Sequence, residues 1–296
     1  MVNVDLHMHG PIGFQEYWLK VQGYQGKNIL KEISDTCFKK EIGICAITSQ
    51  EMEIPGGSIH DRFYQLTQYA KSLPRSYKHD RLGEIALVVE KYGQKTIVFN
   101  SQSVVVFENK NGQQRRIDHL VVGSNQIPNN RSLEDIIKHC QDNGLIQIAE
   151  HAFLTEHFGI GRELLERYIK EFDAIEIHNA QLFLPEIFRL LPAFGSYNKS
   201  INKRARKFAE FYKKPGVANS DAHKIENLGE AYTIMDFTPN LTSPDKLLES
   251  LKLGIKKLNP KNPNIKEGYI PFFDFIDWTT KFSKGVTERL KHDVQF

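Results

Sequence analysis

Short apolar runs alternate along the chain with segments in which apolar residues recur every three or four positions. The first pattern is typical of buried strands and the second of amphipathic helices that pack on a sheet. Their alternation predicts a parallel β/α fold. We expect strands over residues 2–9, 42–48, 145–149, 174–178, 216–219 and 231–237, and helices over residues 29–40, 58–73, 132–143, 162–172, 182–191 and 201–212.

Two regions depart from this rhythm. Three apolar runs, at residues 96–99, 104–107 and 117–122, follow one another without a helical segment, and Asn111-Gly112 supplies a turn between the last two. This predicts an antiparallel excursion inside the parallel fold. After Pro239 the chain becomes rich in proline and aromatic residues, so we divide it into a unit of residues 1–240 and an extension of residues 241–296 that packs on it.

Composition narrows the class of protein. The chain has 296 residues, of which 40% are hydrophobic and 25% charged, which excludes a disordered or fibrous protein. The net charge of +3 is too small to indicate nucleic-acid binding by itself. No apolar run approaches the ~20 residues of a membrane span, so we expect a cytoplasmic protein without a membrane partner. The three cysteines have no paired spacing and are expected to be buried thiols.

Histidines cluster at the ends of the expected strands. His7 and His9 alternate onto one face of the first strand, about 7 Å apart, where one cation can bind both rings. Such a pair alone also fits two hydrogen-bonded histidines at a strand end. Because the carboxyl ends of barrel strands meet at one mouth, further ligand-type residues at other strand ends favour a metal site. These residues are His119, His151, Asp221 and His223.

Four segments resemble the motifs of one family. Residues 5–9 (DLHMH) and 219–223 (NSDAH) look like the first and last motifs of the PHP (polymerase and histidinol phosphatase) family of metal-dependent phosphoesterases. Residues 117–123 (IDHLVVG) and 148–152 (IAEHA) are similar to its inner histidine motifs. The resemblance covers roughly residues 1–240. It implies an α/β fold of the PHP type, a distorted (β/α)7 TIM-like barrel.

The resemblance also implies metal ligands and catalytic residues. His7, His9 and Asp221 would hold one metal with an open position for water, and His119 with His151 would hold a second more weakly. The ions would be zinc, manganese or iron, one or two rather than three. The implied ligands are His7, His9, His119, His151, Asp221 and His223, and the implied catalytic residues are His7, His9, Asp221 and His223.

The sequence departs from the family pattern at two places. Where the family reads T-D-H, this chain reads Thr48-Ser49-Gln50. The glutamate that bridges two metals in the family is aligned with Gln102, although Glu108 is an alternative. A neutral amide is a poor ligand and does not offset the repulsion between two cations. We therefore do not expect a three-metal cluster, and His223, without its partner at Gln50, is expected to donate a hydrogen bond to substrate.

Other polar residues have more open roles. Glu176 and His178 alternate onto one face at a strand end. For Glu176 we favour a role in orienting a ligand histidine over direct metal binding, by about two to one. His178 fits either role. Lys224 and Arg162, from loops beside the ligand strands, are candidates for binding phosphate. Structural hydrogen bonds are expected for Asp5 and Asp118, and surface positions for His60, His79, His139, His157 and His292.

These features lead to a ranked set of functions. The first is a metal-dependent phosphoester hydrolase that acts on a small phosphorylated substrate through a metal-activated water. The second is a catalytically inactive barrel that serves as a binding or regulatory module, because of Ser49, Gln50 and Gln102. The third is a DNA-processing accessory protein, which rests on the resemblance and on a basic helix (Lys203, Arg204, Arg206 and Lys207) that fits a solvated face better.

Overall fold

The computed structural model describes residues 1–11, 16–50, 62–110, 113–155, 158–181, 192–271, 273–274, 276–281 and 283–284. The expected helix over residues 182–191 and the expected turn at Asn111-Gly112 lie outside these residues. So do His60, His157 and His292.

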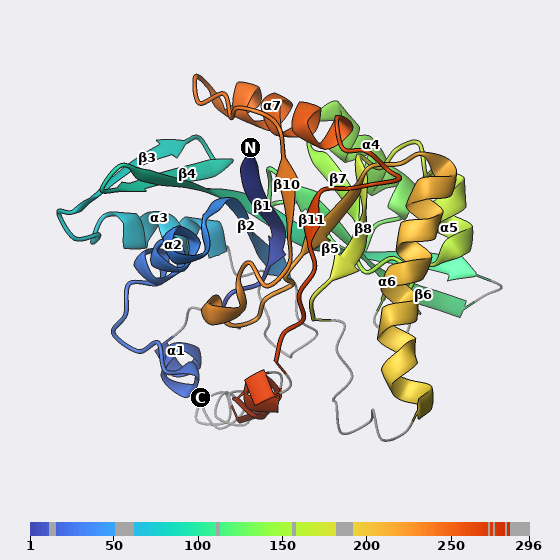
Figure 1. Cartoon of the computed structure of the whole chain (residues 1–296), viewed down its shortest axis with the longest axis horizontal. Coiled ribbons are helices and arrows are strands. Elements are labelled where there is room, and N and C mark those ends of the chain that lie inside the picture. The colour runs from blue at the N-terminus through green and yellow to red at the C-terminus, as the bar shows by residue number, and fades with distance from the viewer. Residues whose placement is uncertain are drawn as a thin grey trace.

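A single curled sheet organises the molecule (Figure 1). A bridge joins Met8, at the end of β1, to Ala222, in the segment after β9. This contact brings the two strands together, so that the sheet nearly closes. This confirms the TIM-like barrel. In hydrogen-bonded order the strands are β11 (Ile265–Lys266), β10 (Tyr232–Met235), β1 (Val2–Met8), β2 (Ile42–Gln50), β5 (Gln94–Lys110), β6 (Gln113–Val122), β7 (Ile146–Ala149), β8 (Ala174–Asn179) and β9 (Gly216–Asn219).

The excursion around β5 and β6 has the predicted antiparallel pairing. However, β5 is one strand of 17 residues rather than two. The polar residues at its centre suggested a break, but they are buried and paired, as in the 2.9 Å hydrogen bond between Ser101 Oγ and Thr48 Oγ1. A hairpin of β3 (Tyr77–Leu82) and β4 (Ala86–Lys91), which the sequence pattern did not predict, extends this side through β5.

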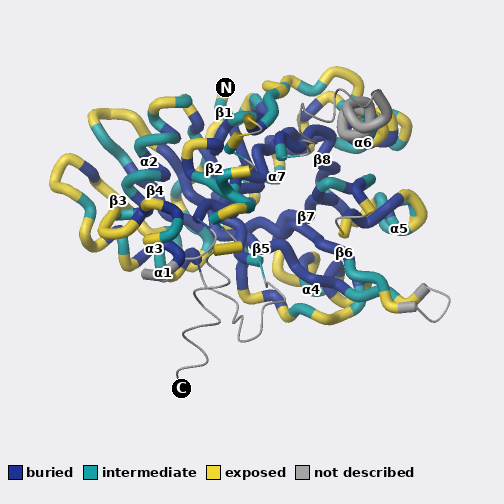
Figure 2. The backbone as a smooth tube through the Cα atoms, turned by 90° about the horizontal axis from the view of Figure 1, so that it is seen from below, coloured by how far each residue is buried: buried dark blue, intermediate teal, exposed yellow. Residues whose placement is uncertain are grey.

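The helices cover the outside of the sheet, and buried residues follow the strands (Figures 1 and 2). Two begin at polar caps: the side chains of Asn28 and Ser132 accept hydrogen bonds from Lys31 N and Asp135 N. Among the described residues, no helix is long and apolar enough to cross a membrane. The helices are α1 (Glu16–Gln22), α2 (Ile29–Lys40), α3 (Arg62–Ala70), α4 (Leu133–Asp142), α5 (Arg162–Tyr168), α6 (Pro192–Tyr212) and α7 (Pro244–Lys256).

Helix α7 was missed because the surrounding prolines suggested irregular structure. Pro244 lies at its first turn, where the missing N–H costs nothing, and Ser243 caps it. Its apolar residues Leu247 and Leu251 share one buried cluster with Val4 of β1 and Val121 of β6. The boundary between residues 1–240 and 241–296 stays a prediction.

Candidate metal centre

The end of β1 brings two imidazoles together. The pairing of β1 with β2 slips between Asp5 and Met8, and Met8 packs into the apolar cluster that contains residues of α2. His7 and His9 are both buried, with their Nε2 atoms 3.1 Å apart. The strand alternation predicted that the rings share a face, and the ring orientations bring the two nitrogens into contact.

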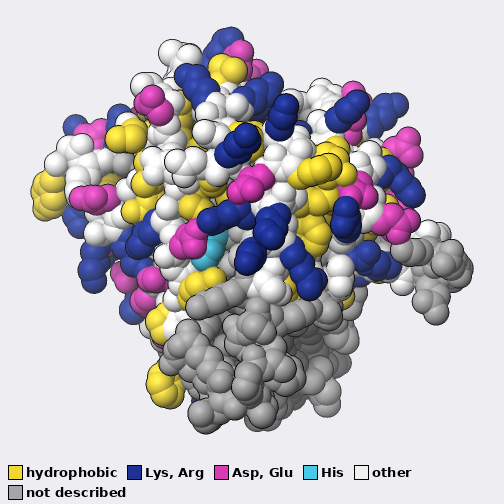
Figure 3. All heavy atoms as spheres, turned by 45° about the vertical axis from the view of Figure 1, so that its right-hand side comes forward, with side chains coloured by type: hydrophobic (Ala, Val, Ile, Leu, Met, Phe, Trp, Pro, Cys, Tyr) yellow, Lys and Arg dark blue, Asp and Glu magenta, His cyan; other side chains and the backbone are white. Residues whose placement is uncertain are grey.

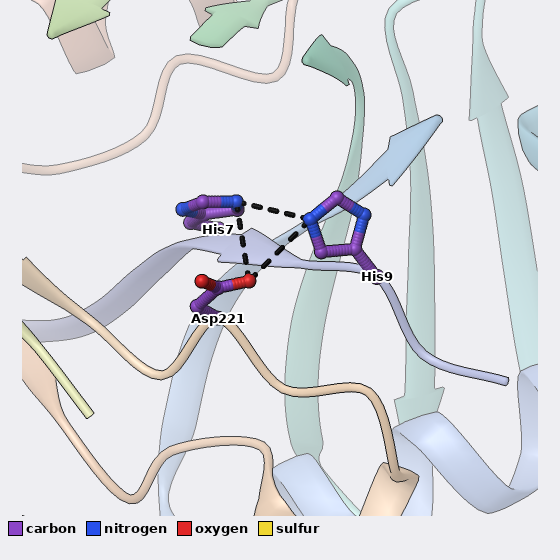
Figure 4. Close-up of side chains that lie close together, drawn as sticks. All are labelled: His7, His9 and Asp221. Atoms are coloured by element: carbon purple, nitrogen blue, oxygen red, sulfur yellow. Dashed lines mark hydrogen bonds and ion pairs between the residues drawn. The ribbon is translucent and has the colours of Figure 1, made fainter. Parts of the chain in front are cut away.

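Asp221 reaches the same point from the loop after β9 (Figure 4). Its backbone is in the left-handed region, with φ 48°, and its N–H donates to His7 O at 2.7 Å. Its Oδ1 lies 3.4 Å from both His7 Nε2 and His9 Nε2. The side chain is fixed by Asn179, whose amide donates to Oδ2 at 3.1 Å. A strained backbone held this firmly is typical of functional sites.

The three ligand atoms have the spacing of a metal's coordination shell. Ligands about 2.0–2.2 Å from a tetrahedral ion are roughly 3.3–3.6 Å from one another. The separations between His7, His9 and Asp221 are 3.1, 3.4 and 3.4 Å. Two imidazoles and one carboxylate suit zinc, manganese or iron and leave a coordination position open.

Glu176 of β8 orients His7. Its carboxylate accepts hydrogen bonds from His7 Nδ1 at 3.1 Å, from Asn219 and Asn179 at 2.9 Å, and from His151 N at 2.7 Å. Burial alone would raise the pKa of Glu176, but the charge of His7 and these hydrogen bonds lower it to about 2. When the His7 ring gives up one proton to bind a cation, an ionised acceptor at Nδ1 keeps the remaining proton there and leaves the Nε2 lone pair for the ion.

The centre gathers three buried carboxyl groups, those of Glu150, Glu176 and Asp221, around His7. Glu150, directly after β7, has Oε2 at 3.1 Å from His7 Nε2. Burial raises the pKa of Glu150 to about 8 and that of Asp221 to about 7. Burial lowers the pKa of His7, but Asp221, Glu176 and Glu150 together raise it well above its usual range. The carboxyl groups of Glu150 and Asp221 resist ionisation and the histidine holds its proton more strongly than usual. Both effects show that positive charge is stabilised at this position.

His151 and His223 flank this centre. His223 lies between the rings of His9 and Trp278, with centroids 4.6 and 4.5 Å away, and burial lowers its pKa to about 3. The ring of His151 lies 6.1 Å from that of His7, and its backbone has φ 28°. The structure therefore brings both predicted residues to the rim of the centre.

The structure does not bring His119 or Gln102 to the cluster. His119 Nε2 lies 3.2 Å from Gln147 Oε1, and its ring packs on Phe172. Gln102 exchanges two 2.9 Å hydrogen bonds with the backbone of Ile127, and Glu108 accepts from Leu133 N. Along β5 and β6 the side chains alternate strictly, and these residues lie on the face away from the cluster.

Their neighbours face the cluster instead. Asp118, expected to be only structural, accepts hydrogen bonds from Gln50 Nε2 at 3.0 Å and from Arg116. Its charge is close enough to contribute to the raised pKa of Glu150, after burial itself. The histidine motif drew the prediction to His151, so Glu150 was missed. Its position directly after β7 was the feature of the sequence that could have predicted it.

The other predicted residues have other partners. Lys224 Nζ binds Asp274 at 2.8 Å and Asp277 at 2.9 Å, and Arg162 is exposed and pairs with Glu166. His178 Nε2 donates to Gly268 O at 2.8 Å, and its Nδ1 lies 3.3 Å from Asn202. In the basic helix, Arg206 binds Glu267. Basic side chains are interspersed with acidic ones on the face shown in Figure 3.

Comparison with known proteins supports the resemblance. Residues 199–254, which include Asp221 and His223, match the profile of the family described as PHP-associated. The fold is similar to that of PsfC from Pseudomonas syringae PB-5123, at 12% identity and TM-score 0.52, over 97% of this chain and 99% of that one. It is also similar to a two-domain protein containing a predicted PHP-like metal-dependent phosphoesterase from Bacteroides vulgatus ATCC 8482, at 11% identity and TM-score 0.50, over 90% of this chain and 65% of that one.

The chain has the barrel fold of these two structures, and one segment of it matches a PHP-associated family model. The barrel carries the His7, His9 and Asp221 group at the mouth, where the segments that resemble PHP motifs come together. A lesion-specific endonuclease, PfuEndoQ from Pyrococcus furiosus, matches at 14% identity and TM-score 0.49 over 89% of this chain. The chain spans 57% of that protein's length. No curated protein sequence matches the chain significantly.

Proposed function

We propose that this PHP barrel is a metal-dependent phosphoester hydrolase. The observation that carries the proposal is the meeting of His7 Nε2, His9 Nε2 and Asp221 Oδ1 within 3.4 Å of one another, with Glu176 hydrogen-bonded to His7 Nδ1. A divalent zinc, manganese or iron ion bound there would activate water and polarise a phosphoryl oxygen.

The protein's own residues prepare the centre. Glu176 holds the His7 ring in one tautomer, and Asn179 holds both Glu176 and Asp221, so the donor atoms need little rearrangement to bind a cation. His223 is neutral and stacked beside His9, where it can donate a hydrogen bond to a substrate oxygen. A preorganised arrangement of this kind reduces the cost of reaching the transition state.

For the substrate phosphate we assign Arg62. Arg62, the first residue of α3, is buried, and after burial and neighbouring histidines its charge contributes to the low pKa of His9. Arg62→Lys should raise KM more than it lowers kcat, since the charge stays but the planar fork is lost.

The test is hydrolysis of an aryl phosphate by the full chain with added manganese or zinc. His9→Ala should abolish metal-dependent turnover, whereas His79→Ala, at an exposed position on β3, should leave it unchanged. Melting curves verify that both variants fold. Turnover that survives His9→Ala in a folded protein would refute the proposal. Metal binding without turnover on any phosphoester would favour an inactive binding module.

A further inference from the structure

The C-terminal segment, of which residues 265–271, 273–274, 276–281 and 283–284 are described, runs along the barrel to its mouth. It begins with β11, which pairs with β10 through Ile265 and Lys266. Figure 1 shows the chain continuing from β11 to its last described residues, drawn in red, at the end of the barrel opposite α7. These residues are helical over 276–281. The segment therefore brings late residues of the chain to the mouth.

Contacts at the end of β8 fix the path of this segment. Ile270 N donates to Ala180 O at 3.1 Å, one residue after the strand. His178 Nε2 donates to Gly268 O at 2.8 Å, and the His178 ring lies 5.0 Å from that of Tyr269. Because β8 is one of the strands whose ends surround the metal centre, the segment is anchored beside the centre.

Lys224 holds the helical part of the segment. Its Nζ lies 2.8 Å from an oxygen of Asp274 and 2.9 Å from an oxygen of Asp277, and Asp277 also pairs with Lys281 at 2.9 Å. Ion pairs this exposed contribute little to stability. Two that converge on one ammonium group nevertheless define where the helical residues lie. Lys224 directly follows His223, so the segment is held next to this imidazole.

Trp278 meets the His223 ring at this contact. The two ring centroids are 4.5 Å apart and the planes are inclined by 63°, an edge-to-face arrangement that is favourable for aromatic rings. The ring of His9 lies 4.6 Å from the same imidazole, at 35°. His223 Nδ1 lies 3.0 Å from Asp221 O. The indole is therefore part of the packing that sets the orientation of His223 beside the ligand His9.

We propose that Trp278 is a positioning residue for substrate binding, which holds the His223 imidazole where it contacts a substrate oxygen. The inference rests on the proposed function only in taking His223 as a contact of the substrate. A side chain that is fixed before binding loses less conformational freedom when the substrate arrives, so the substrate binds more tightly. Trp278 acts through His223 and leaves the ligand atoms of His7, His9 and Asp221 unchanged. The C-terminal segment thereby completes the substrate side of the site.

Binding of methylphosphonate, a stable analogue of a phosphoester, tests this inference without turnover. Calorimetry measures its affinity for the full chain in manganese chloride, and a separate titration of the metal-free protein measures the affinity for manganese. Trp278→Ala should weaken methylphosphonate binding roughly 3- to 10-fold, the effect of immobilising one side chain. Trp278→Phe keeps an aromatic edge and should restore most of the affinity. Manganese affinity should be unchanged in both variants, whereas a general loss of structure would lower it as well.

Two further variants make the test specific. Phe273→Ala removes an aromatic side chain of the same segment that is 81% exposed, and it should leave both affinities unchanged. In His223→Ala, the additional change Trp278→Ala should have no further effect on methylphosphonate binding, because the residue through which Trp278 acts is gone.

Equal methylphosphonate affinity in Trp278→Ala and the unsubstituted protein would overturn the inference. So would the full loss on top of His223→Ala, a parallel fall in manganese affinity, or no binding of methylphosphonate by the unsubstituted protein. If Trp278→Ala does not fold, Trp278→Leu, which keeps an apolar side chain, replaces it. The expected binding pattern without hydrolysis of the aryl phosphate would refute only the proposed function, whereas hydrolysis with additive effects of the two substitutions would refute only this inference.

Discussion

The residues predicted from the motifs meet on one side of the barrel mouth and face away from it on the other. At the ends of β1, β8 and β9, the predicted residues His7, His9 and Asp221 meet, with Glu176 behind them. On β5 and β6, Gln102 and His119 face away, and Asp118 takes a place near the cluster.

The difference lies in how each backbone is fixed. Around β1 and β9, hydrogen bonds such as Asp221 N to His7 O and His9 N to Ala222 O tie the irregular strand ends together. On β5 and β6 the ladder is continuous over ten residue pairs, and an error of one position places a side chain on the opposite face. Motif residues therefore predict a site best where the chain leaves the strand, and worst inside a regular antiparallel pair.

The largest expected effect comes from Asp221→Asn on the first side. An amide in place of the carboxylate removes the only negative ligand of the His7, His9 and Asp221 group, so affinity for manganese should fall more than the roughly 100-fold limit seen for outer contacts. Calorimetric titration of the metal-free protein measures it. Unchanged affinity would show that the group does not hold a cation.

Glu176→Gln on the same side should have a smaller effect. The amide can still contact His7, but it lacks the charge that fixes the Nδ1 proton, so metal affinity should fall about 10- to 100-fold. The same titration measures this loss. A loss as large as that of Asp221→Asn would instead make Glu176 a direct ligand.

His119→Gln tests the second side through stability. Burial lowers the pKa of His119 to about 4, so the folded protein keeps it neutral while the unfolded chain binds a proton below about pH 6.5. Stability from this group is present above about pH 6.5 and lost as the pH falls toward 4, by about 2–3 kcal/mol. Urea unfolding at pH 7 and 4.5 should show a smaller difference in the variant. An identical difference would contradict neutral burial of His119.

The smallest effect is expected where the C-terminal segment meets the first side. Replacing Asp274 and Asp277 together by Asn removes both carboxylates from Lys224 Nζ. These carboxylates are about one-third exposed, so the free energy of unfolding should fall by less than about 1 kcal/mol. Thermal unfolding at low and high salt checks it. A larger loss would mean that the segment helps to hold the barrel closed.

The sequence pattern determined the alternation of strands and helices and the antiparallel excursion, and its resemblance to PHP motifs implied the barrel and the group of His7, His9 and Asp221. Periodicity and motif spacing are properties of short segments, so they can be read from the sequence before the fold is known. Helix α7 and the hairpin of β3 and β4 were not predicted. Proline near α7 and charged residues in β3 weaken the local patterns that indicate a helix or a strand.

Only the tertiary structure decided which of two neighbouring residues faces the mouth. Nothing in the local pattern chooses between His119 and Asp118, or between His151 and Glu150, because the choice depends on strand register and on where each strand ends. The same holds for Lys224, whose partners lie about 50 residues further along the chain. Distances between remote segments are set by packing, and so the charge around the metal centre emerges only in the folded protein.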